Sequence, residues 1–175
     1  MTVDFEEWYR SEYPRLVNTI ALATGDRSVA VDAASEACVR ALARWDRVSR
    51  MTQPGGWVYK VALNDARRRL RKGAREREFM RGLAPGIDLV APASEPDHDL
   101  WQAVARLPQR TREAVVLRYV ADLTEPAIAR TLGVRRGTVA TMLRRANERL
   151  AAELGSRFTS DDHDDKNGAF AHAFH

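Results

Sequence analysis

The stretch from Ile128 to Leu143, IARTLGVRRGTVATML, constrains the fold of this chain more than any other part of its sequence. Two short runs with apolar residues at helical spacing flank a single glycine, Gly133. The small residue Ala129 stands four positions before that glycine, and the branched residue Val139 stands six positions after it. The glycine lets the chain leave the first helix with a positive φ, and the small residue allows a second helix to cross closely. This order of residues predicts a helix-turn-helix.

The second helix of such a motif lies in the major groove when the motif binds DNA. Its polar side here is rich in arginine and threonine, which contact both phosphates and base edges. Arg135 stands where a cap residue would accept backbone N–H groups, and its charge opposes the helix dipole, so we expect it to bind phosphate. Two packed helices with solvated arginines are the alternative. The candidate DNA-contacting residues are Arg135, with Arg136, Thr138 and Thr141 as base readers, and Arg144 and Arg145.

Helical periodicity also dominates the rest of the chain, and strand signals are scarce. It predicts helices over 5–23, 28–45, 57–72, 100–107 and 108–120. Between 73 and 99 the periodicity lapses while glycine and proline recur, which is typical of a linker. No periodicity remains after residue 154, so we expect residues 155–175 to be disordered. The sequence therefore predicts an all-α protein with two small helical domains, 1–72 and 100–154, joined by a flexible linker, 73–99.

Positive charge is concentrated in two segments, although the formal net charge is only +4. Basic residues crowd 67–81 and 130–149. Such local density favours a polyanionic partner, with solvated helix faces as the alternative. The C-terminal segment is acidic instead, and one hypothesis is that it lies over basic surface and weakens DNA binding. Its acidic residues are Asp161, Asp162, Asp164 and Asp165.

The remaining composition excludes several classes of protein. The single cysteine, Cys38, allows no disulfide within the chain, and its apolar setting predicts a small buried residue rather than a catalytic thiol. The acidic, aromatic N-terminus is unlike a signal peptide, and no apolar run approaches the ~20 residues that span a bilayer. His163, His172 and His175 lack the spacing of metal ligands. We expect a cytoplasmic protein with no membrane insertion and no metal.

Residues 107–150, read together, resemble region 4 of the sigma-70 family, specifically the small extracytoplasmic-function (ECF) sigma factors. The shared features are a Leu-Pro, an Arg-Glu pair, an apolar Leu-Arg-Tyr and the helix-turn-helix with Gly-Thr-Val. The N-terminal half resembles region 2 independently. There, YPRLV (13–17) looks like the opening helix, VDAASEACVRALARWDRV (31–48) like the polymerase-binding helix and PGGWVYKVALNDARRRLRK (54–72) like the −10 element helix.

The resemblance implies a factor that has no cofactor and no catalytic activity of its own. Its partners would be core RNA polymerase, promoter DNA and an anti-sigma factor. Region 2 would bind polymerase through Asp32, Ser35 and Glu36 and would melt and read the −10 element, while region 4 would read the −35 element as duplex. Melted DNA is held by aromatic stacking and a basic track. The candidate −10 residues are Trp57, Tyr59, Lys60, Asn64, Arg67, Arg68 and Arg71, with a place in the core as the alternative for Trp57 and Tyr59.

Some positions depart from the family pattern. Segment 32–38 keeps two acidic residues but lacks the larger apolar residues and the glutamine that are usual there. A helix-turn-helix regulator that no longer binds polymerase productively is therefore the alternative function. An enzyme such as a nuclease is a third, which the sequence disfavours because it shows no metal-ligand cluster or Gly-rich phosphate loop. Ala140, Thr141 and Met142 replace the family's common Lys-Ser-Arg triplet, so its promoter preference does not carry over.

Overall fold

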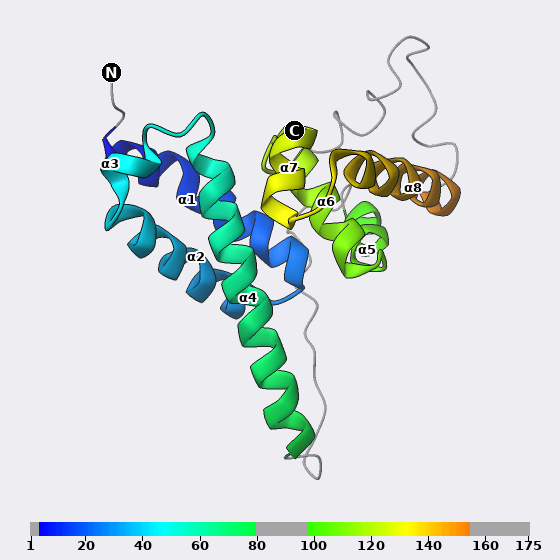
Figure 1. Ribbon diagram of the computed structural model, residues 1–175. Helices are drawn as coiled ribbons and strands as arrows, with labels where there is room; N and C mark the ends of the chain where they lie inside the picture. The colour runs from blue at the N-terminus through cyan, green and yellow to red at the C-terminus, as the bar shows by residue number, and fades with distance from the viewer. Residues whose placement is uncertain (1–3, 80–97, 155–175) are drawn as a thin grey trace. The chain divides into compact units, whose positions relative to one another are not determined.

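The computed structural model describes residues 4–79 and 98–154, which form two compact units (Figure 1). All regular elements in these two ranges are α-helices, so the predicted all-α class is confirmed for the described part of the chain. Most of the predicted linker, the predicted disordered tail and its three histidines lie outside the described residues. No helix in the described ranges is both long and apolar enough to cross a membrane.

The first unit opens with two helices that are joined by a tight turn. Gly25 ends the first helix with φ at 75°, a left-handed conformation that glycine adopts without steric cost. Asp26 then caps the second helix, because its side chain accepts a hydrogen bond from the N–H of Val29 at 2.9 Å. The helices of this unit are α1 (Phe5–Thr24), α2 (Arg27–Leu42), α3 (Trp45–Val48) and α4 (Pro54–Phe79).

The core of the first unit lies between α1, α2 and α4, which pack against one another. Leu16 and Ile20 of α1 and Leu63 of α4 are among its largest fully buried side chains. The buried residues of α2 are all small, which allows the two neighbouring helices to approach it closely. They are Ala30, Ala33, Ala34, Ala37, Cys38 and Ala41.

Cys38 is a buried residue of α2, as the sequence predicts. Burial raises the pKa of its thiol to about 11. The thiol therefore stays protonated at neutral pH, which suits a packing residue and not a nucleophile.

Several boundaries in the first unit differ from the sequence prediction, and α2 ends at Leu42 and not at residue 45. Helix α4 begins at Pro54 and continues beyond Lys72 to Phe79, so residues 73–79 are helical and not part of a linker. Figure 1 shows its C-terminal end projecting past α1 and α2. Most of the short helix α3 also lies between the predicted helices 28–45 and 57–72, where the sequence predicted none. Helix α4 continues through Gly73 because a glycine in a helix interior lowers helix stability by only about 1 kcal/mol relative to alanine. A helix of this length tolerates that loss.

In the second unit, the second and fourth helices, α6 and α8, each pack against the other three. Three arginines of α6 donate hydrogen bonds to the carbonyls where other segments end: Arg110 to Leu132 at 3.5 Å, Arg112 to Ala105 at 2.7 Å and Arg118 to Leu123 at 3.4 Å. Leu132 and Ala105 end helices, where carbonyls lack partners within the helix, whereas Leu123 lies in the connection that follows α6. All three contacts hold neighbouring segments against α6. The helices of this unit are α5 (His98–Ala105), α6 (Gln109–Tyr119), α7 (Glu125–Leu132) and α8 (Arg136–Leu154).

Candidate nucleic-acid and polymerase interfaces

The turn between α7 and α8 has the geometry that the sequence predicts. Gly133 has φ at 68°, and its own N–H and that of Val134 both donate to the carbonyl of Ala129. This pair of bonds closes the C-terminal end of α7, and only glycine reaches the required φ without strain. Val139 and Leu143 turn inward from α8 and are buried. The predicted helix-turn-helix is thus present in the fold.

Arg135 stands immediately before α8. The N–H groups of Thr138 and Val139 donate to its backbone carbonyl at 3.0 and 3.3 Å, so it occupies the capping position of this helix. Its side chain is exposed. An arginine has no acceptor to offer the first N–H groups of the helix, and its charge is left available for a phosphate.

The other predicted contacts on α8 divide into two sets. Thr138, Thr141 and Arg145 are exposed and lie three or four positions apart, so they share one face of the helix. Arg136 instead lies 3.6 Å from Glu125 at the start of α7. Arg144 is paired with the carboxylate one turn later on α8. The DNA-contacting roles of all six residues remain predictions.

A second basic stripe follows α4. Lys60, Asn64, Arg67 and Arg71 recur every three or four positions and therefore lie on one side of the helix. Arg67 donates a hydrogen bond to the amide oxygen of Asn64 at 3.2 Å. Trp57, at the start of the helix, is half-buried. These residues form a continuous track suited to a phosphate backbone, and their contact with the −10 element remains a prediction.

Tyr59 is a correction to the predicted set of −10 residues. Its side chain is only 3% exposed, so it cannot stack on a DNA base in this conformation. Burial is the main cause that raises its pKa, to about 12. The sequence carried a signal for this burial, because Ala62, Leu63 and Ala66 follow Tyr59 at helical spacing and are also buried.

Arg68 belongs to a network of charged side chains in the first unit. The buried Asp65 lies at the centre of this network. The carboxylate of Asp65 accepts hydrogen bonds from Arg68 and Arg69, each at 2.5 Å. Burial raises the pKa of Asp65, but the hydrogen bonds and charges of Arg69 and Arg68 outweigh it and leave the pKa below its ordinary value. Arg69 also reaches Asp32 on α2 at 3.0 Å. The network therefore ties α4 to α2, a role that sequence spacing did not reveal.

The three predicted polymerase-binding residues on α2 all have partners within the chain. Asp32 pairs with Arg69, Glu36 pairs with Arg40 at 2.7 Å, and the hydroxyls of Ser35 and Tyr13 lie 2.9 Å apart. These contacts leave the three side chains partly exposed, and their role in polymerase binding remains a prediction.

An apolar surface on the same helix was missed by the sequence analysis. Val31, Val39 and Leu42 are 38%, 63% and 56% exposed and share the face that carries Asp32 and Ser35. Large apolar side chains grouped on an exposed helix face indicate a protein-binding site. The signal was present in the spacing of these residues, but only the fold shows that no other described helix of the first unit covers this face of α2.

A helical bundle with a basic stripe and a separate helix-turn-helix define a two-unit DNA-binding protein. Family profiles bear this out: Sigma-70 region 2 matches residues 8–76, and Sigma-70, region 4 matches residues 97–150. The chain is 30% identical to RNA polymerase sigma factor SigV of Bacillus subtilis, over 71% of this chain and 75% of SigV. It therefore belongs to the sigma-70 family of RNA polymerase sigma factors, in the ECF subfamily.

Two further comparisons agree. The chain is 28% identical to ECF RNA polymerase sigma factor SigW of Bacillus subtilis, over 74% of this chain and 78% of SigW. The solved structure of the sigma factor RpoE from Bartonella quintana, in complex with the anti-sigma factor NepR, superposes with a TM-score of 0.76 at 22% identity. The match covers 91% of this chain and 99% of RpoE, so the two proteins share their fold.

Proposed function

We propose that this chain is a transcription initiation factor that binds core RNA polymerase and directs it to specific promoters. One observation carries the proposal: region 2 and region 4 of the family occur in one chain, in that order, and each folds around its own core. Two DNA-binding units on one chain suit two separate promoter elements, because the first contact raises the effective concentration of the second.

Polymerase binding is assigned to α2. Its exposed face combines Val31, Val39 and Leu42 with the carboxylates of Asp32 and Glu36. An apolar centre with a charged edge is the usual make-up of a protein interface. This surface favours initiation over the alternative of a regulator that has lost polymerase binding.

DNA binding is assigned to two helices. The stripe on α4 with Lys60, Arg67 and Arg71 would hold the −10 element, and the face of α8 with Thr138 and Arg145 would read the −35 element. Both faces are basic; Lys60, Arg71, Thr138 and Arg145 are exposed and Arg67 is half-buried. The first turn of α8 follows the helix-turn-helix geometry of major-groove readers. Arg136 would have to leave Glu125 to reach a base, which costs little because this exposed pair contributes about 1 kcal/mol or less.

Run-off transcription tests the proposal. Core RNA polymerase is incubated with a library of genomic fragments, with and without this protein. We expect discrete transcripts only when the protein is present, and we expect them to disappear with Arg67→Glu/Arg71→Glu although polymerase binding persists. A protein that binds DNA fragments but neither binds core polymerase nor yields transcripts would instead be the regulator.

The regulation of the factor is also part of the proposal. RpoE, which shares the fold, was solved with an anti-sigma factor, and we assign a partner of that class to this chain. The protein would act in the cytoplasm beside the polymerase, and the proposal requires no reaction catalysed by the chain itself. Co-purification of the tagged protein from cells grown without stress would identify the partner.

A further inference from the structure

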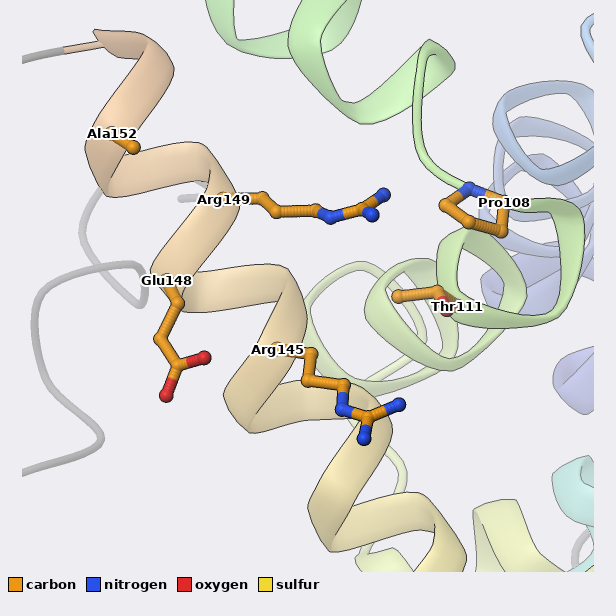
Figure 2. Close-up of a pocket in the computed structure, with 6 residues that line it drawn as sticks. All are labelled: Pro108, Thr111, Arg145, Glu148, Arg149 and Ala152. Atoms are coloured by element: carbon orange, nitrogen blue, oxygen red, sulfur yellow. The ribbon is translucent and has the colours of Figure 1, made fainter.

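A groove runs along the C-terminal half of α8, where this helix faces the start of α6. It has a volume of about 320 Å³ and is lined by Pro108 and Thr111 on one side and by Arg145, Glu148, Arg149 and Ala152 on the other. Figure 2 shows both arginines pointing from α8 toward the start of α6, while Glu148 points away.

A second hollow continues this groove along the same helix. It has a volume of about 340 Å³, shares Arg149 and Ala152 with the first and adds Ala103, Arg106, Leu107 and Glu153. The two hollows together present an apolar floor of alanine, proline and leucine, three guanidinium groups and the carboxylates of Glu148 and Glu153. We call this surface the arginine groove.

Two of the charges in the arginine groove are not compensated. Arg106 is paired with Glu153, and Glu148 is paired with Arg144. Arg145 and Arg149 have no carboxylate partner among the residues that the structure describes. Guanidinium groups over an apolar floor attract a carboxylate more strongly than they would in open water, since the nearby protein displaces solvent. The groove is therefore suited to an acidic peptide segment.

We propose that the occupant is the acidic segment of this same chain, Asp161–Asp165. The segment contains four aspartates and follows α8, which ends at Leu154. Arg149 and Arg145 lie about 7.5 and 13.5 Å back along the helix axis, at 1.5 Å per residue. The chain from Leu154 to Asp161 spans up to about 23 Å when extended. The aspartates thus reach both arginines, and the short connection gives them an effective concentration near the millimolar range.

Docking of this segment would weaken DNA binding, a consequence that rests on the proposed function. Arg145 shares its helix face with Thr138 and Thr141, so a segment bound there covers part of the DNA-reading surface. It also neutralises charge that would otherwise contact phosphate. The full chain would then be autoinhibited for DNA binding. A partner that displaces the acidic segment from the groove would restore DNA binding.

Fluorescence anisotropy with a duplex of mixed sequence tests the effect on DNA. The full chain is compared with the variant Asp161→Asn/Asp162→Asn/Asp164→Asn/Asp165→Asn at low and high salt. We expect the variant to bind about tenfold more tightly at low salt, with the difference vanishing at high salt. The matched control places the same charge change in the other unit, with Glu6→Gln/Glu7→Gln/Asp46→Asn/Glu76→Gln. An equal gain in this control, or equal DNA affinity of the full chain and the tail variant when both bind DNA, overturns the proposal.

A measurement without DNA separates docking from the proposed function. The side-chain Nε–Hε NMR resonances of Arg145 and Arg149 are compared between the full chain and the tail variant, with Arg135 as internal reference. We expect the resonances of Arg145 and Arg149 to differ between the two proteins, and the resonance of Arg135 to stay unchanged. If neither shifts, the acidic segment does not occupy the groove, and a separate acidic partner would be its ligand. If they shift while neither protein binds DNA, docking stands and the proposed function fails.

Discussion

Glycine is favoured at position 133 because of its backbone conformation and not because of lack of space. Its φ is 68°, and nothing lies within 4 Å of the position that a Cβ would take. Gly133→Ala should therefore lower the free energy of unfolding of the second unit by about 1 to 2 kcal/mol, the cost of a left-handed residue with a side chain. Hydrogen exchange of the α8 amides measures this. The control is Gly137→Ala. A Cβ at Gly137 also has free space, but this residue has helical φ, so the substitution should not lower the free energy of unfolding. Equal losses in both variants would point to crowding instead.

Asp65 tests how a buried carboxylate stabilises the first unit. Asp65→Asn keeps the shape but removes the charge that Arg68 and Arg69 bind, so we expect a loss of about 2 kcal/mol. Asp32→Asn removes only the exposed outer carboxylate and should cost less than about 1 kcal/mol. Urea unfolding at pH 7, followed by tryptophan fluorescence, compares the two. The network would be unimportant if both variants were as stable as the native chain.

The same residue gives a pH dependence with a defined sign. The pKa of Asp65 is lower in the folded protein than in the unfolded chain. Its contribution to stability is therefore complete above the unfolded pKa of about 3.9 and is lost as the pH falls through the lower, folded pKa. The stability gap between the native chain and Asp65→Asn should thus be constant from pH 7 to pH 5 and should close below about pH 4.

At the scale of elements, the residue before α8, Arg135, is expected to favour DNA binding at the expense of helix stability. Arg135→Ser supplies the missing cap and should stabilise α8 by about 1 kcal/mol. It removes the proposed phosphate contact of Arg135, so affinity should fall equally for all DNA sequences, and the salt dependence should weaken by roughly one counterion. Thermal unfolding and anisotropy at several salt concentrations measure both effects. Tighter DNA binding by this variant would refute the phosphate assignment.

The exposed apolar face of α2 allows a test that leaves the fold intact. Val39→Asp/Leu42→Asp places charges at positions that are 63% and 56% exposed, so thermal unfolding should barely change. Affinity for core polymerase should fall at least tenfold, since buried apolar contacts at the centre of an interface each contribute about 1 to 2 kcal/mol or more. The control Asn18→Asp adds a charge at an exposed site on α1. Unchanged polymerase affinity in the double variant would move the interface elsewhere.

At the scale of the whole molecule, the chain forms two compact units, and we expect its function to depend on the segment that connects them. A Gly/Ser insertion that doubles the length of segment 80–97 should reduce the binding of a promoter with both elements by about threefold, as effective concentration falls with the −3/2 power of linker length. A promoter with the −10 element alone should be unaffected. Competition between the two promoters for holoenzyme measures the ratio of their affinities before and after the insertion. A large loss on both promoters would show that the segment makes specific contacts.

Local features of the sequence were sufficient for most of the elements. Periodicity predicted the helices of both units, and the order of Ala129, Gly133 and Val139 predicted the helix-turn-helix, because a turn with positive φ is decided by the few residues that form it. The end of α4 was misplaced, since charged residues such as Arg75 and Glu76 extend a helix without an apolar pattern to reveal it.

The sequence by itself thus determined the helices, the turn and the family of the protein. Only the tertiary structure decided which exposed faces remain. Tyr59 is covered by its neighbours, Asp32 is held by Arg69, and Val39 stays open to a partner. The physical reason is that spacing along a helix fixes which side chains share a face, whereas burial and ion pairing depend on residues distant in the chain.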